Sequence, residues 1–160
     1  MGDAPPIPLP TRAQLREVLA ALVGDVTVSD AMPRPPAPTD CIAVYGDDAE
    51  AVAAIAVIDV GLAAAAGAAV GLAPPRVADY ARETRTIAGT VRDGLREIVH
   101  VLATLFGRDE LRIRFAALHV VRADAPPACH ALAERPGARL DVHVDLGPYG
   151  RGVLSLLTRR

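Results

Sequence analysis

The segment spanning residues 86–106 constrains the fold more than any other part of the chain, because it has the pattern of one long helix with two faces. Its apolar residues recur at steps of three and four, the spacing of a stripe that packs against a core. That stripe comprises Ile87, Val91, Leu95, Ile98, Leu102 and Leu105. At about 100° per residue, a second row falls on roughly the opposite side and contains Asp93, Glu97, His100 and Thr104. A core stripe does not account for two acids, an imidazole and a hydroxyl in line, so this row is the candidate functional face.

The first half of the chain predicts helices alternating with a hairpin. Thr11 can cap a first helix, and a proline-rich loop follows at residues 31–38. Residues 41–45 and 52–58 are expected to form the two strands of a hairpin. Asp59 can then cap an alanine-rich helix that ends near Gly71.

The second half of the chain changes from a helical period to the period of strands. Residues 111–121 predict a strand with an irregularity at residues 116–117, and residues 128–137 predict a loop or a short helical turn. Residues 140–146 alternate apolar and polar, which indicates a half-buried strand, and residues 153–157 predict the last strand. The sum is an α+β domain: an antiparallel sheet with two main helices packed on one face.

Length and composition indicate one globular domain. The chain has 160 residues and a net charge of -2, which suits a single domain over residues 11–160 preceded by a flexible tail over residues 1–10. Without a basic excess, and without tryptophan, nothing indicates a nucleic-acid partner. The two cysteines, Cys41 and Cys129, form no close-spaced pair, so we expect a reduced, cytoplasmic setting.

Residues 51–73 raise the alternative of a membrane span, because Asp59 is their only charge. However, most of this segment is Ala and Gly, which insert weakly, and a central Asp costs roughly 2.5–3.5 kcal/mol on insertion scales. The β-branched residues of the first part favour a buried strand followed by a helix. We therefore expect no membrane association.

Asp141, His143 and Asp145 share one face of a predicted strand and superficially resemble a metal-ligand set. Alternation alone already predicts that these three side chains form the exposed face, and such a pattern on a single strand is weak evidence for a metal. We expect neither a metal site nor a nucleotide site, because the sequence has no phosphate-loop or dinucleotide glycine motif.

The order of elements and the long helix resemble the CheC/CheX family of chemotaxis-type phosphatases. In that family a helix carries Asp or Ser, three residues, Glu, two residues and Asn, with a proline about two dozen residues later. Here Asp93 and Glu97 fit the first two positions, His100 stands where the family has Asn, and Pro126 is the candidate for the late proline. The resemblance extends over residues 11–157 and implies a CheX-like fold.

The resemblance also implies a function in signal transduction. Family members dock on a phosphorylated receiver domain of a response regulator, where the motif Glu pairs with a receiver lysine and the Asn amide orients water for attack on the aspartyl phosphate. It therefore implies Glu97 and His100 as catalytic residues, and Asp93, Glu97, His100 and Thr104 as partner-binding residues. No cofactor of the domain's own is implied, because the Mg²⁺ belongs to the receiver.

His100 is the departure from the family pattern. An amide presents its donor and acceptor side by side, whereas neutral imidazole has them on opposite sides of a ring. Three interpretations of the row stay open at this point: a solvated helix face, a docking surface without catalysis, and an active phospho-aspartate phosphatase. Whether the chain is an enzyme is therefore open as well.

A second class of function is a catalytically inactive structural or assembly module that dimerises through the same fold. Residues 140–146, with their clean alternation, are the candidate sheet edge for such pairing.

Overall fold

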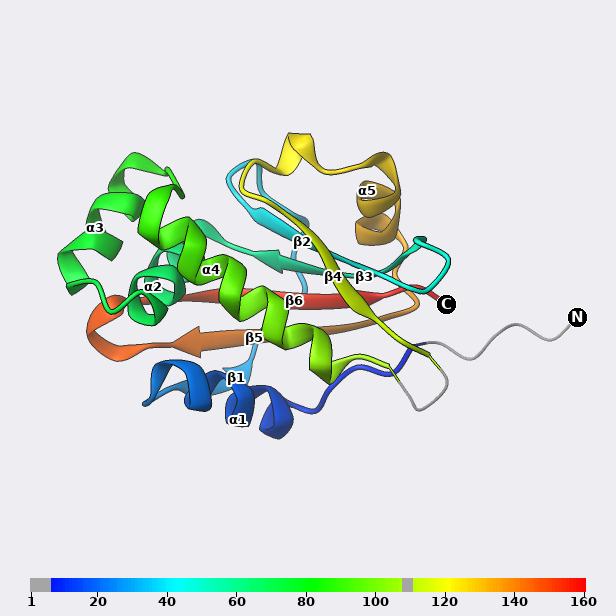
Figure 1. Cartoon of the computed structure of the whole chain (residues 1–160), viewed down its shortest axis with the longest axis horizontal. Coiled ribbons are helices and arrows are strands. Elements are labelled where there is room, and N and C mark those ends of the chain that lie inside the picture. Colours follow the sequence, from blue (N-terminus) through cyan, green and yellow to red (C-terminus); the bar gives the residue numbers. More distant parts are fainter. Residues whose placement is uncertain (1–6, 108–110) are drawn as a thin grey trace, which may run out of the picture.

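The computed structural model of the chain describes residues 7–107 and 111–160 (Figure 1). Within these residues one antiparallel sheet has six strands in the order β1-β5-β6-β3-β2-β4. The strands are β1 (Thr27–Asp30), β2 (Cys41–Gly46), β3 (Val52–Ile58), β4 (Arg114–His119), β5 (Ala138–Asp145) and β6 (Arg151–Thr158). The helices are α1 (Arg12–Val23), α2 (Val60–Val70), α3 (Pro75–Thr84), α4 (Gly89–Leu102) and α5 (Pro127–Glu134). Short 3-10 turns are η1 (Ala103–Leu105), η2 (Arg122–Asp124) and η3 (Gly147–Tyr149).

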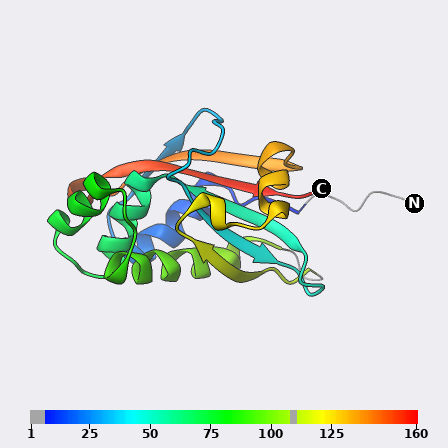
Figure 2. The ribbon, with the colours of Figure 1, turned by 90° about the horizontal axis from the view of Figure 1, so that it is seen from above.

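The sheet carries helices on both faces, and the predicted α+β fold class is confirmed. The main core lies between one face of the sheet and helices α1, α2 and α4, so the two main helices share a face as expected (Figure 1). Helix α5 covers part of the opposite face, over a smaller apolar cluster that includes Ile42, Val57 and Leu132. In Figure 2, α4 runs along one side of the sheet and the loop before β2 rises on the other. The sequence predicts a loop or a short helical turn over residues 128–137, whereas the structure has the eight-residue helix α5 there.

Both predicted N-caps are confirmed. Thr11 and Gln14 form a reciprocal capping box at the start of α1. Asp59 accepts a hydrogen bond from the backbone N–H of Leu62 at 2.8 Å, and its second oxygen accepts one from the N–H of Val153 at 2.9 Å. One carboxylate therefore caps α2 and also fastens it to the neighbouring strand β6.

Helices α2 and α4 cross at two glycines. A Cβ atom added to Gly67 would lie 2.9 Å from the carbonyl carbon of Val91, and one added to Gly94 would lie 3.1 Å from the Cα atom of Gly67. Residues Leu62 to Ala69 of α2 are buried without exception, because α2 lies between the sheet and α4. The small residues of this segment thus allow a close helix crossing rather than a membrane span. Among the described residues, no helix is long and apolar enough to cross a bilayer.

The long helix is shorter than the pattern predicted. It begins at Gly89, and its last predicted turn is the 3-10 turn η1. The chain before it is extended at Ala88 (φ -146°, ψ 168°) and left-handed at Arg85 (φ 53°), so residues 86–88 link α3 to α4. Ile87 is nevertheless buried, which explains why it fits the apolar stripe.

Strand β4 carries the expected irregularity. Val44 pairs with Ala117 but Tyr45 pairs with Phe115, so Ala116 is an extra residue in the ladder. Such a bulge bends the strand and disrupts pairing. It lies on an outer strand of the sheet, beside α4.

Strand β5 is where the structure departs most from prediction. It is not a sheet edge, because Val142 to Asp145 pair with β1 on one side and with β6 on the other. Asp141 is buried rather than exposed, and accepts hydrogen bonds from Arg139 and Ser155. His143 and Asp145 are exposed as predicted. The outer strands of the sheet are β1 and β4.

The beginning of the described chain lies against the domain. Ile7 is buried, and its carbonyl accepts a hydrogen bond from the Thr158 hydroxyl at 2.9 Å. Residues 7–10 therefore differ from the expected flexible tail, while residues 1–6 lie outside the described residues.

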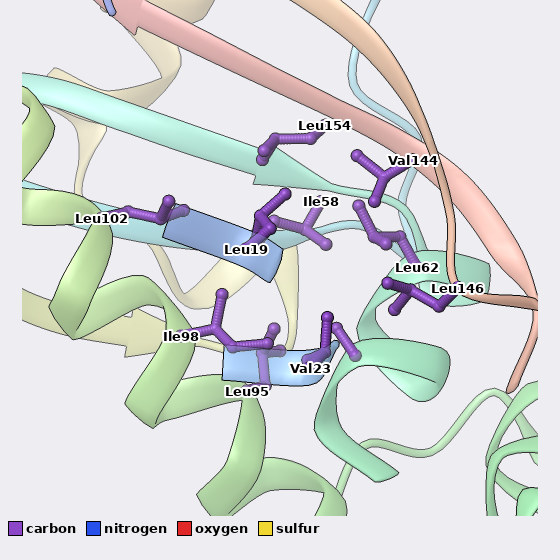
Figure 3. A pocket seen from close by; sticks show the side chains of 11 residues that line it. Leu19, Val23, Ile58, Leu62, Leu95, Ile98, Leu102, Val144, Leu146 and Leu154 are labelled. Atoms are coloured by element: carbon purple, nitrogen blue, oxygen red, sulfur yellow. The ribbon is translucent and has the colours of Figure 1, made fainter. Parts of the chain in front are cut away.

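A small cavity of about 20 Å³ lies in the main core (Figure 3). Its walls are apolar side chains from α1, α2, α4 and the sheet, including Leu19, Leu95 and Leu154. A cavity of this size holds about one water at most, and a water needs polar partners that these walls do not supply. It is a packing defect and not a ligand site.

Candidate functional site

The outer side of α4 carries the row that the sequence singled out. Asp93, Glu97, His100 and Thr104 are all exposed, so their predicted position on one face is confirmed. Within the described chain, Asp93 and Glu97 form no ion pair. The Thr104 hydroxyl lies in η1 and donates to the carbonyl of Val101 at 2.8 Å. Its hydrogen is therefore already used, while the two carboxylates stay available to a partner.

The helix below the row is firmly anchored. The Tyr45 hydroxyl, fully buried in the core, donates to the carbonyl of Val99 at 2.6 Å. Burial raises the pKa of Tyr45, which keeps its hydroxyl a proton donor. Together with the crossing at Gly94, this bond fixes the depth of α4 against the sheet. The row is thus displayed on a rigid element, as a precise binding surface requires.

Strand β4 adds an aromatic side chain beside the row. The rings of His100 and Phe115 are 5.6 Å apart between centroids, and the Arg96 guanidinium carbon lies 5.2 Å from the Phe115 centroid. Such a cation–π contact contributes about 0.5–1 kcal/mol at an exposed site. Phe115 and Arg96 hold the His100 side of the helix in a defined arrangement. We call Asp93, Arg96, Glu97, His100, Thr104 and Phe115 together the α4 face.

Sequence reasoning missed Arg96 and Phe115 as parts of this surface. Arg96 lies within the motif but is not one of its family positions. Phe115 is one of only two phenylalanines in the chain, which is the signal that was available. Phe115 lies close to His100 because strand β4 packs beside α4, and the spacing of residues in the sequence does not predict this packing.

Pro126, the candidate for the late motif proline, is not brought to the α4 face. It caps the N-terminus of α5, which covers the opposite face of the sheet. The structure therefore separates this proline from Asp93, Glu97 and His100.

Covalent chemistry has little support in the described part of the chain. Cys41 and Cys129 are free and buried. Burial raises the pKa of the Cys41 thiol to about 12, with the charges of Asp40 and Asp59 adding to the shift, and burial also raises that of Cys129. A thiol that stays protonated is a poor nucleophile. Within residues 7–107 and 111–160, no group of three or more His, Cys, Asp or Glu side chains could hold a metal ion. The α4 face is thus suited to binding a cationic group and to hydrogen bonding through an imidazole.

Comparison with known proteins identifies the fold. No family model matches the chain, and no curated protein sequence matches it. Among solved structures, the middle domain of FliM from H. pylori aligns with a TM-score of 0.54 at 9% identity, over 92% of this chain and 84% of that one. The FliG–FliM complex from H. pylori gives 0.51 at 9% identity, over 92% and 86%. The CheX–CheY–BeF3–Mg+2 complex from Borrelia burgdorferi gives 0.46 at 10% identity, over 91% and 93%.

The likeness covers nearly the whole chain, so it concerns the complete architecture rather than a shared motif. At 9% identity it establishes the fold alone. The chain therefore has the fold of the FliM middle domain: an α+β domain built on one antiparallel sheet.

Proposed function

We propose that this protein is a CheX-like signalling domain that binds a receiver-domain response regulator through the α4 face, in a cytoplasmic setting. One observation carries the proposal: two exposed carboxylates that form no ion pair within the described chain lie in line with an imidazole on a rigidly anchored helix, next to an aromatic ring of β4. Placed four residues apart on a helix, Asp93 and Glu97 repel each other mildly and so add nothing to helix stability. A cationic partner group would remove that repulsion.

Glu97 is the residue that we expect to dominate the binding energy. By resemblance it pairs with the lysine of the receiver's active site, and a close charge pair across an interface contributes more when water is excluded from it. Phe115 and Arg96, which contact each other next to His100, supply aromatic and guanidinium surface, the side-chain types enriched at binding hot spots. Exclusion of water from Glu97 by the docked receiver is what would raise its contribution above that of a solvated ion pair.

The test is a binding measurement with receiver domains from the same organism, each with and without beryllofluoride as the phosphate mimic. We expect a receiver that binds the wild type, and an affinity loss of about tenfold or more for Glu97→Gln, corresponding to at least 1.4 kcal/mol. Glu17→Gln is the matched control, because Glu17 is an exposed acid on α1. Equal affinity of wild type and Glu97→Gln for every receiver would refute docking through this face.

Hydrolysis of the receiver's aspartyl phosphate is the enzymatic extension of the same proposal. Glu97 and His100 are three residues apart on one helix face, so both side chains can enter one partner site. Catalysis would consist of positioning water for in-line attack, without a covalent intermediate on this domain. Phosphate release from a phosphorylated receiver should be accelerated by the wild type and lost in His100→Ala. If the wild type is inactive and the His100→Asn variant releases phosphate, the wild-type protein would bind the receiver without hydrolysing its phosphate, and the rest of the site would be intact.

A second candidate is a non-enzymatic assembly module, and the fold favours it. This chain shares the fold of the FliM middle domain and also aligns with FliM in a FliG–FliM complex, so proteins with this architecture occur in protein assemblies. Self-association through a sheet edge would have to use β1 or β4, since β5 is paired on both sides over Val142 to Asp145. Sedimentation equilibrium decides this point, because a strict monomer at high concentration excludes homodimerisation.

A further inference from the structure

A cleft of about 470 Å³ lies on the face of the sheet opposite the α4 face. Ligand sites commonly measure about 300–1,000 Å³, so the cleft is large enough for a small molecule. Its two walls are the loop at residues 33–36 and helix α5, and strand residue Arg139 belongs to its lining. A narrow inner extension shares Arg34 and Arg139 and reaches Ser155 and Leu157 of β6.

Basic side chains from four separate segments line this cleft. They are Arg34 of the loop, Arg122 of η2, His130 of α5 and Arg139 of β5, and the acid among the lining residues is Glu134. Guanidinium groups bind carboxylate and phosphate with paired hydrogen bonds, which makes them the preferred side chains for oxyanion recognition. We propose that this cleft binds a small molecule bearing a phosphate or carboxylate group.

Two of the arginines are held in place from behind by buried carboxylates. Asp40 is fully buried and accepts hydrogen bonds from Nη1 and Nη2 of Arg34, at 2.9 Å and 3.1 Å. Asp141 accepts from Nε and Nη2 of Arg139, at 2.8 Å each, and from the Ser155 hydroxyl at 2.6 Å. Within the described chain, Nε of Arg34 and Nη1 of Arg139 donate no hydrogen bond. Each guanidinium is therefore fixed in orientation and still has N–H groups to offer.

Arg122 and His130 are basic side chains of the cleft that have no partner within the described chain. Among the described residues, neither side chain takes part in a hydrogen bond or an ion pair, although both are partly buried. Arg34 and Arg139 are each paired with a carboxylate, whereas Arg122 is the arginine of the cleft that forms no ion pair within the described chain. An oxyanion beside Arg122 would gain a charge-assisted bond without displacing any internal partner.

The walls of the cleft are preorganised. Pro33, Pro35 and Pro36 restrict the loop backbone, and the N–H of Ala37 donates to Asp40 at 2.7 Å. On the other wall, His130 and Glu134 lie on one side of α5 while Cys129 and Leu132 are buried against the sheet. A site that needs little ordering on binding keeps more of its interaction energy.

The experiment is calorimetric titration of the full chain in Tris chloride with two probes, inorganic phosphate and succinate. We expect saturable binding of one probe molecule per chain, and the probe that binds identifies the oxyanion as phosphate or carboxylate. Arg122→Gln should weaken that binding about tenfold, the effect of losing about 1.4 kcal/mol. Its thermal unfolding should match the wild type, because the fold does not use this side chain. Arg76→Gln, which removes an exposed charge from α3, is the matched control and should bind as the wild type does.

Nitrogen-15 NMR of the arginine Nε–H groups gives an independent readout, since Arg34 and Arg139 should shift on saturation and Arg76 should not. Absence of saturable binding of both probes overturns the proposal. So does binding that Arg122→Gln leaves unchanged, or that Arg76→Gln weakens equally, because either result describes adventitious surface binding. The cleft lies on the opposite face of the sheet from Glu97, so failure here leaves the receiver-docking proposal standing, and failure there leaves this one standing.

Discussion

The crossing of α2 and α4 makes a strong prediction about stability. In an isolated helix, Gly→Ala stabilises by about 0.8–1.0 kcal/mol, because alanine loses less backbone entropy. At Gly94 the new Cβ would lie 2.9 Å from the carbonyl carbon of Gly67, 3.1 Å from its Cα atom and closer still to its carbonyl oxygen. Backbone atoms cannot rotate away as a side chain can, so the helices must separate.

The free-energy cost of separating α2 and α4 can be worked out from the side-chain packing that is lost between them. A gap of about 0.5–1 Å forfeits a quarter to a half of each dispersion contact across it. Overpacking in a core usually costs about 1–3 kcal/mol, and this crossing has Leu95 and Ile98 of α4 packed in the same core. Because the new Cβ meets backbone atoms, the upper end of that range applies. After subtracting the gain in helix propensity of about 1 kcal/mol, we expect Gly94→Ala to destabilise by about 1–2 kcal/mol.

A double-mutant cycle makes the reasoning refutable. Gly67→Ala would place its Cβ 2.9 Å from the carbonyl carbon of Val91, so it opens the same crossing as Gly94→Ala. Once one substitution has separated the helices, the second should cost less, and the double variant should be less destabilised than the sum. Urea unfolding of the three variants and of Thr90→Ala, an exposed position on α4, measures this. A Gly94→Ala variant as stable as the wild type, or strict additivity, would refute the close crossing.

Three further predictions concern stability. Val23→Ile places one methylene in the core cavity of about 20 Å³. At about 24 cal/mol per Å³ the filled volume is worth about 0.5 kcal/mol, so the Tm should rise by about 1–2 °C, and a fall in Tm would contradict the presence of the cavity. Burial opposes ionisation of Asp141, but hydrogen bonds from Arg139 and Ser155 outweigh it and hold the pKa below the ordinary 3.8. The stabilisation by ionised Asp141 is therefore present above pH 3.8 and is lost as the pH falls through the lower pKa of the folded state. Urea unfolding at several pH values should show that the difference in unfolding free energy between wild type and Asp141→Asn becomes smaller on acidification. Asp59→Ala removes both the cap of α2 and the bond from Val153, and should cost more than the ~1 kcal/mol of a simple cap; a loss below that in thermal unfolding would show that the link to β6 contributes nothing.

Much of the secondary structure could be predicted because its signals are local. The cap at Thr11 acts within three residues, and the alternation of β5 arises from the geometry of a single strand. Even the irregularity beside Ala117 was visible, because the pattern of apolar residues slips there. The helix boundary at Gly89 was missed because the buried Ile87 continues the apolar period beyond the helix itself.

The candidate sites also contain a part that the sequence predicted and a part that it did not. The exposed row with Glu97 and His100 was predicted because one helix aligns it. The contact of His100 with Phe115 could not be predicted, because it depends on which strand packs beside α4. The cleft was even less predictable from the sequence. Arg34 and Arg139 are separated by most of the chain, and only the order of the strands in the sheet brings them together.

The sequence by itself determined most of the helices and strands, the exposed face of α4 and the α+β class, since periodicity, caps and turn residues act over a few positions. Only the tertiary structure decided that β5 lies inside the sheet, that Asp141 is buried with Arg139, and that two glycines join α2 to α4. The physical reason is that strand order and helix crossings are selected by the packing of the whole core. Contacts between distant residues contribute to that choice together, and no single local pattern records them.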